Sequence, residues 1–252
     1  MRKRLVVFSS IALAVILAVS PVAFAQSGAV AKSDLSGVFA RTGGLRTLTD
    51  PPPPMTPAGK ARYDANKPSY NLPSNPRAIP PALGNDPAGS CDPLGLVRSL
   101  YTVGRQYMEF VETPNRIFQF FEWNHLWRTI WMDGRKLPED PDPKWYGYSV
   151  GHWEGDTLVV ESSGFDDRTW LDQYGHPLSG SMKVEERWRR VGDTLEMVLK
   201  VDDPETYTKP WIGDKVVWRL QPKGEIHEEI CAPTDENLFN EKLRNRAGGI
   251  SK

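Results

Sequence analysis

One segment of the chain concentrates side chains that could do acid/base chemistry. Residues 164–177, GFDDRTWLDQYGHP, hold Asp172 and His176 close enough to meet across a turn. A carboxylate bonded to one imidazole nitrogen fixes the tautomer, so the other nitrogen can act as an acid or a base. Arg168 would stabilise developing negative charge. Asp172, His176 and Arg168 are therefore the candidate catalytic residues. In the alternative interpretation the aspartates only cap turns and His176 lies exposed.

Aromatic side chains are dense enough to suggest a small-molecule site. Six of them fall within the 14 residues from Phe118 to Trp131. Aromatic residues on both faces of a predicted hairpin suggest that one face enters the core and the other lines a cavity. The expected ligand is a small apolar, aromatic or sugar-like molecule, and ordinary core packing is the alternative. The candidate ligand-binding residues are Trp123, Trp127, Trp131, Trp153, Trp170 and Tyr174.

Patterns for metal, cofactor or covalent chemistry are weak. The histidines are far apart in the sequence, and a zinc site using His227 and Glu229 would need a third ligand from elsewhere. The chain has no phosphate-cradling glycine motif and no nucleophile elbow before a helix. We therefore expect no metal and no cofactor.

The elements that must position these residues are short strands separated by turns. Met182, Val184, Glu186 and Trp188 share one face of such a strand, opposite charged residues. No long amphipathic helix intervenes, and a long meander needs closed edges. An all-β, antiparallel up-and-down (lipocalin-like) barrel is expected, with a two-layer β-sandwich as the alternative. The predicted strands are 106–111, 116–122, 126–132, 148–153, 157–162, 181–191, 194–201, 215–221 and 225–231.

Composition divides the chain into four parts. Residues 1–25 have the basic start, apolar run and Ala23-Phe24-Ala25 ending of a signal peptide, with cleavage expected before Gln26. Residues 26–95 form a proline-rich, mostly irregular arm, with one helix expected over 56–66 because Thr56 suits its N-cap. Residues 96–234 form the antiparallel β domain, and 235–252 form a short helix and tail.

Export determines the expected compartment of the protein and the state of its cysteines. The protein is expected to be periplasmic or secreted, with no membrane insertion after signal cleavage. In an oxidising compartment its two cysteines, Cys91 and Cys231, are expected to form a disulfide. Loss of three basic residues with the signal peptide leaves a net charge of about −4, which argues against a nucleic-acid-binding or anionic-membrane surface.

Four motifs of the chain resemble a widespread family of exported bacterial proteins. They are WMDGR (131–135), SVGHWEGDTLVV (149–160), GFDDRTWLDQYGHP (164–177) and DDPETYTKPW (202–211). The resemblance covers roughly residues 56–232. That family has no assigned function, so the resemblance implies no catalytic residue.

Three functions fit these observations. The leading one is binding of a small apolar or aromatic molecule in a β-barrel, with the 164–177 loop at its mouth. The second is a cofactor-free acid/base enzyme, such as a hydrolase, lyase or isomerase. The third is a structural or partner-docking envelope protein that uses the proline-rich arm.

Overall fold

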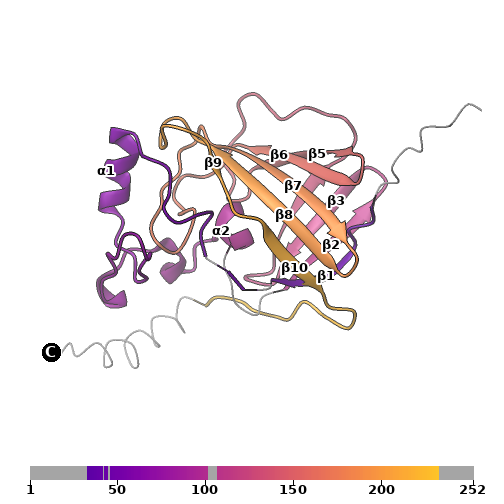
Figure 1. Ribbon diagram of the computed structural model, residues 1–252, viewed down its shortest axis with the longest axis horizontal. Helices are drawn as coiled ribbons and strands as arrows, with labels where there is room; N and C mark the ends of the chain where they lie inside the picture. Colours follow the sequence, from indigo (N-terminus) through magenta and orange to yellow (C-terminus); the bar gives the residue numbers. More distant parts are fainter. Residues whose placement is uncertain (1–32, 42, 45, 102–106, 233–252) are drawn as a thin grey trace, which may run out of the picture.

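The computed structural model describes residues 33–41, 43, 44, 46–101 and 107–232. The predicted signal peptide and terminal helix lie outside these residues. Figure 1 shows a β-barrel with short helices gathered at one end. The helical elements are α1 (Pro57–Ala65), η1 (Pro81–Leu83), η2 (Pro87–Ser90) and α2 (Leu96–Tyr101). The strands are β1 (Gly37–Arg41), β2 (Tyr107–Thr113), β3 (Arg116–Phe121), β4 (Leu126–Trp131), β5 (Tyr148–Glu154), β6 (Thr157–Ser163), β7 (Lys183–Val191), β8 (Thr194–Asp202), β9 (Trp211–Ile212) and β10 (Val216–Leu220).

The sheet closes on itself, which confirms the predicted all-β barrel. Its strands follow the order β10-β1-β2-β3-β4-β5-β6-β7-β8, and β10 pairs with β8 to complete the ring. The short β9 adds to the end of β8. One neighbouring pair, β4 and β5, is parallel rather than antiparallel. A parallel pair needs a long connection, and residues 132–147 supply it here.

Three strand assignments differ from the sequence-based expectation, and one of them is the short, unexpected β9. Residues 225–231 do not form a strand, and Glu229 makes a single bridge to Trp123. The strand that completes the barrel is instead β1, which comes from the proline-rich segment 26–95 that was expected to be mostly irregular. Phe39 of β1 is completely buried, and this strand pairs with both β2 and β10. Closure of the barrel therefore depends on a strand that is distant in sequence from its β10 partner.

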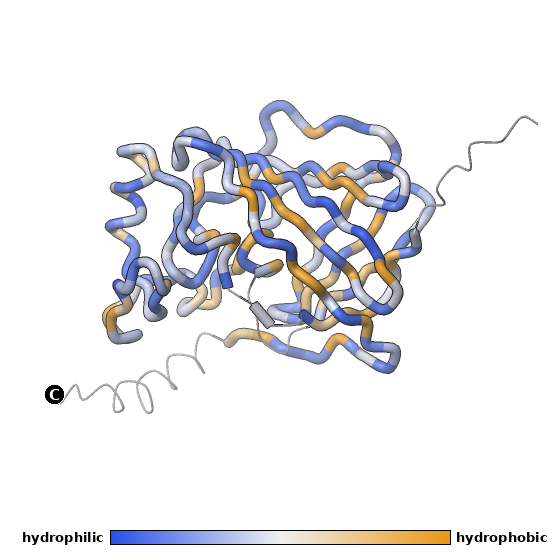
Figure 2. Tube along the Cα trace, in the orientation of Figure 1, coloured by the Kyte–Doolittle hydropathy of each residue, from blue (hydrophilic) through white to orange (hydrophobic). Residues whose placement is uncertain are grey.

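Side chains fill the barrel interior. Buried residues alternate along several strands, as in β8, where Leu195, Met197, Leu199 and Val201 are fully buried. Trp188 of β7 also lies inside. Figure 2 shows the hydrophobic positions concentrated along the barrel strands, with α1 mostly hydrophilic. A ring of about eight or nine strands is narrow enough for side chains to occupy it.

The two ends of the barrel differ. Tight turns join β2 to β3, β5 to β6 and β7 to β8 at one end. The segments 164–182 and 203–215 leave the other end, which we call the barrel mouth, and segment 132–147 crosses to it from the end of β4. Helix α2 lies there between α1 and the strands, and all of its residues are buried (Figure 1). The mouth is therefore the end at which loops can build a site.

The described part of the proline-rich arm packs onto the mouth loops. Helix α1 begins as predicted, because the Thr56 hydroxyl accepts a hydrogen bond from the Gly59 amide at 3.0 Å. The Thr56 amide donates to the Thr206 carbonyl oxygen at 3.0 Å. The Cys91–Cys231 disulfide, present as predicted, joins the arm to the end of the β domain. Among the described residues, no helix is long and apolar enough to cross a membrane.

Replacing Gly59 by alanine tests how closely α1 approaches the barrel. A Cβ atom at this position would lie 2.2 Å from the Thr206 carbonyl oxygen, which is backbone and cannot move aside alone. We expect Gly59→Ala to lower the free energy of unfolding by about 1–3 kcal/mol, although alanine is the better helix former. Urea unfolding measures this change. Ala61→Gly on the exposed face is the control, and a gain in stability for Gly59→Ala would contradict the close approach.

Candidate functional site

Asp172 and His176 meet as predicted, in a tight reversal of the chain. The Leu171 amide donates to the His176 carbonyl at 2.8 Å, and Gly175 permits the turn with a φ of 88°. His176 Nδ1 then lies 2.6 Å from Asp172 Oδ2. Asp172 Oδ1 accepts from the Tyr174 amide at 2.9 Å. The local turn therefore builds the carboxylate–imidazole pair.

The pair is fully buried, in contrast to the alternative in which His176 is exposed. Tyr63 of α1 stacks on the imidazole with ring centroids 5.0 Å apart, and Trp211 meets it edge-on at 5.0 Å. His176 Nε2 is also buried and has no hydrogen-bond partner among the described residues. The arm therefore covers the side chain that acid/base catalysis would require.

Asp172 is held in its charged form. Burial acts to raise the pKa of this carboxyl, but interaction with His176 and hydrogen bonds from Thr47 and the Tyr174 amide outweigh it. The pKa of Asp172 therefore lies below its ordinary value. The carboxylate state fits its four hydrogen bonds, since an ionised carboxyl only accepts.

Arg168, the third candidate catalytic residue, lies elsewhere on the loop. Its guanidinium is exposed, pairs with Asp166 at 2.6 Å and covers the Trp145 ring at 4.5 Å from the centroid. Its hydrogen bond to Asp166 holds the pKa of Arg168 above its ordinary value. These contacts give Arg168 a role in shaping the loop surface.

The six candidate ligand-binding aromatic residues do not gather around one cavity. Trp127 is 54% exposed on the outer face of β4, where it contacts Phe118 and Phe120. Trp131 is covered by two arginine side chains. The remaining four are spread over a turn, a strand and the 164–177 loop: Trp123, Trp153, Trp170 and Tyr174.

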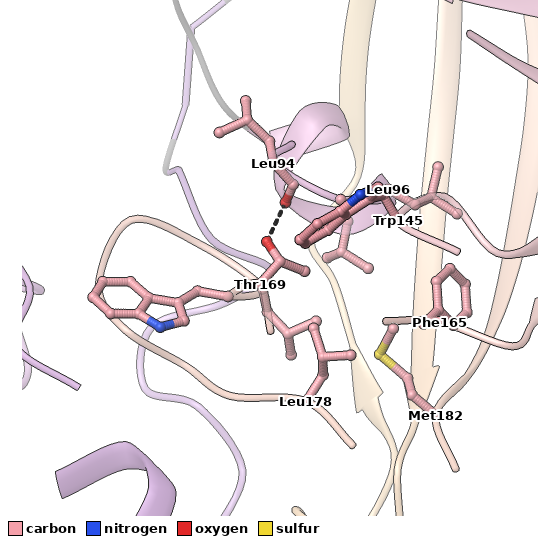
Figure 3. Close-up of a pocket in the computed structure, with 11 residues that line it drawn as sticks. Leu94, Leu96, Trp145, Phe165, Thr169, Leu178 and Met182 are labelled. Carbon is pink, nitrogen blue, oxygen red and sulfur yellow. Dashed lines mark hydrogen bonds between the residues drawn. The ribbon is translucent and has the colours of Figure 1, made fainter. Parts of the chain in front are cut away.

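Trp170 does line a small apolar gap between α2 and the 164–177 loop. Figure 3 shows Trp145, Phe165, Leu178 and Met182 around it, with the Thr169 hydroxyl donating to the Leu94 carbonyl at 2.8 Å. The gap holds about 10 Å³, close to the minimum for one water molecule. This gap is a packing feature rather than a ligand site.

A larger cleft opens at the barrel mouth, where β1 and α2 end and β10 begins. Its volume is about 220 Å³. Its lining includes the charged residues Arg41 and Lys215 and the almost fully buried Thr47 and Leu48. The complete described lining is Arg41, Gly43, Gly44, Thr47, Leu48, Tyr101, Asp214, Lys215, Val216 and Val217. A cleft lined by both apolar and polar residues is the usual form of a small-molecule site.

Thr47 connects this cleft to the buried pair. It lines the cleft, and its hydroxyl donates to Asp172 Oδ2 at 2.5 Å. The same carboxylate oxygen faces His176 Nδ1. A continuous chain of hydrogen bonds therefore runs from the cleft through Thr47 and Asp172 to His176.

Sequence reasoning missed Arg41 and a buried ion pair inside the barrel. Arg128 of β4 and Glu186 of β7 pair through two hydrogen bonds of 2.7 and 2.6 Å, and both are almost fully buried. The signal was available, since Glu186 shares its strand face with Val184 and Trp188. A charged residue at an inward position requires a partner.

The described residues offer no metal centre, since no group of three or more histidine, cysteine, aspartate or glutamate side chains is placed to hold an ion. The Glu122–His227 pair, with 2.7 Å between Oε1 and Nδ1, lacks a third ligand of this kind. No protein-family profile, curated protein or solved structure matches this chain.

Proposed function

We propose that this protein is exported and binds a small molecule in the cleft at the barrel mouth. The observation that carries the proposal is a cleft of about 220 Å³ whose lining includes Arg41, Thr47 and Lys215. Export is supported by the signal-like N-terminal segment and by the disulfide between Cys91 and Cys231, which suits an oxidising compartment.

The mouth is favoured over the barrel interior for two reasons. The interior is occupied by core side chains such as Phe110 and Trp188, whose ring centroids lie 5.2 Å apart. The cleft, in contrast, is lined by Val217 together with the charged residues Arg41 and Lys215. Its volume lies below the roughly 300 Å³ of common ligand pockets, so the ligand is small.

Filling the cleft tests this proposal. We expect protein purified from its native compartment to carry a small molecule that native mass spectrometry detects. Val217→Trp should lower the occupancy of the cleft by this molecule at least tenfold, because the indole takes up space at the cleft wall. The matched control is Val111→Trp, which places the same side chain at an exposed position of β2. Equal occupancy in both variants, or no stabilising compound in a thermal-shift screen of small molecules, would overturn the proposal.

A second candidate function is cofactor-free acid/base catalysis by His176. The observation that favours it is the hydrogen-bonded chain from Thr47 through Asp172 to His176. In this mechanism Asp172 orients the imidazole and His176 exchanges a proton once its Nε2 is uncovered from Tyr63. A screen of small ester and lactone substrates tests it. Turnover that persists in both His176→Gln and Asp172→Asn, measured on folded protein, would remove these residues from any such reaction.

A further inference from the structure

We propose that residues 49–90, which we call the strap, form a gate over His176. The strap moves away from the barrel mouth as one unit and exposes His176 Nε2 while the barrel stays folded. It contains α1 and lies at the mouth end of the barrel (Figure 1). This inference rests on the second candidate function, because it states how the buried imidazole becomes accessible to a substrate.

Both ends of the strap are fixed to the rest of the protein. Just before it, Leu48 is fully buried in the hydrophobic core. Just after it, Cys91 forms the disulfide with Cys231. Near this second end, Asp86 accepts two hydrogen bonds of 2.7 Å from the Arg98 guanidinium of α2. The strap is therefore a long loop that is held at two points.

Between these two points the strap packs shallowly. No described residue between Leu48 and Leu96 belongs to the contiguous hydrophobic core, although Met55 packs against its edge. Within α1, only Gly59 and Tyr63 are buried. A segment that buries little apolar surface opens at a lower free energy than the whole domain unfolds. The strap can therefore separate from the mouth while the barrel remains intact.

Tyr63, which covers His176, is tied to other parts of the strap. Arg77 donates to the Tyr63 carbonyl at 2.7 Å, and its guanidinium lies 4.0 Å from the centroid of the Tyr63 ring. The Asn75 side-chain amide donates to the Tyr63 hydroxyl at 3.2 Å. Because these contacts lie within the strap, Tyr63 leaves the imidazole when the strap moves.

Polar contacts hold the strap against the mouth loops. The Asn66 side-chain amide donates to the Gly175 carbonyl, in the turn that carries His176, at 2.8 Å. The Thr56 hydroxyl donates to the Glu205 carbonyl at 2.6 Å. Water replaces both hydrogen bonds when the strap opens, so each adds only a modest net stability to the closed state.

The closed strap leaves one atom of the catalytic candidate unsatisfied. His176 Nδ1 is bonded to Asp172, whereas Nε2 is buried and has no hydrogen-bond partner among the described residues. A buried ring nitrogen without a partner lowers the stability of the closed state, and water satisfies it once Tyr63 moves away. Opening therefore exposes the nitrogen that proton transfer requires.

Carbethoxylation of histidines by diethyl pyrocarbonate, located by peptide mass spectrometry in the full protein, tests the gate. We expect His176 to react through local opening, at a rate that changes little with urea concentration below the unfolding midpoint. Reaction through global unfolding would instead accelerate steeply with urea, because unfolding exposes much more surface. His152, whose side chain is 56% exposed, reports the reactivity of an uncovered histidine in the same sample.

Two asparagine variants locate the opening. Asn66→Ala should raise the reaction rate of His176 about 3- to 10-fold without urea, because the strap loses its hydrogen bond to the Gly175 carbonyl. Asn71→Ala is the matched control, since the Asn71 side chain accepts from the Ala78 amide within the strap. It should leave the reaction rate of His176 close to that of the wild type.

The outcomes separate the gate from the second candidate function. A His176 rate that rises with urea as steeply as global unfolding, or no reaction below the midpoint, would overturn the gate. Equal rates in Asn66→Ala and Asn71→Ala would overturn it as well. The labelling uses no substrate, so local opening in a protein without turnover would leave the gate in place and remove only the catalytic role.

Discussion

Glu186→Gln is expected to lower the free energy of unfolding by about 3–5 kcal/mol, because it leaves the buried Arg128 charge without a full counter-charge. Arg128 Nη1 and Nη2 contact the two carboxylate oxygens of Glu186 at 2.7 and 2.6 Å. A glutamine offers a single acceptor oxygen at this position and adds a donor. The Trp188 indole, which donates to Glu186 Oε2 at 2.9 Å, competes for that oxygen.

The rest of the network cannot compensate for the lost charge. Arg128 Nε donates to the Gln119 side chain at 2.7 Å, and Ser149 lies 3.4 Å from Nη1. Both partners are neutral. Water cannot replace the carboxylate without opening the barrel, since the Arg128 and Glu186 side chains are 2% and 0% exposed. The variant therefore retains a desolvated cation in the core.

Urea unfolding measures the loss, and two further variants identify its cause. The double variant Arg128→Met with Glu186→Leu removes both charges, so it should recover most of the stability. Glu196→Gln is the matched control, because Glu196 pairs with Lys215 at the surface and contributes only about 0–1 kcal/mol. A double variant as unstable as Glu186→Gln would show that shape, not uncompensated charge, causes the loss.

Asp172→Asn is expected to lower the free energy of unfolding by about 2–4 kcal/mol at neutral pH. Asp172 accepts from the Thr47 hydroxyl, from His176 Nδ1 and from the amides of Tyr174 and His176. The amide nitrogen of asparagine would face donors where the carboxylate oxygen accepted. Because the pair is completely buried, the lost bonds cannot be replaced by solvent.

The same substitution should change how stability depends on pH. The pKa of Asp172 is lowered in the folded state from an ordinary value of 3.8, so near that pH the unfolded chain binds more protons. The contribution of the Asp172 carboxylate to folding stability is therefore complete above about pH 4, and it is lost as the pH falls through the lowered pKa. Wild type and Asp172→Asn should converge in stability below this window.

Thermal unfolding between pH 2 and pH 8 checks this convergence. Asp133→Asn is the matched control, since Asp133 has a lowered pKa from its hydrogen bond to Arg135 but lies at the surface. Its effect on the unfolding temperature should be small at every pH. A difference between wild type and Asp172→Asn that stays constant down to pH 2 would assign the loss to packing instead of the carboxylate.

Local pattern accounts for much of the fold. Alternation placed Val184, Glu186 and Trp188 on the inner face of β7, and the turns at Gly155 and Gly192 separated the hairpin strands. The α1 start followed from Thr56 and Pro57. These features depend on residues a few positions apart, so the amino-acid sequence by itself determined them, including the meeting of Asp172 and His176 across one turn.

Features that depend on contacts between distant segments were decided by the tertiary structure alone. A strand of five residues offers little periodic pattern in the sequence, yet β1 completes the barrel because it pairs with two strands far along the chain. Arg128 and Glu186 come together only through closure of the sheet, and the cleft forms where the ends of β1, α2 and β10 meet. Such contacts arise from register and packing between elements, which spacing within a segment does not encode.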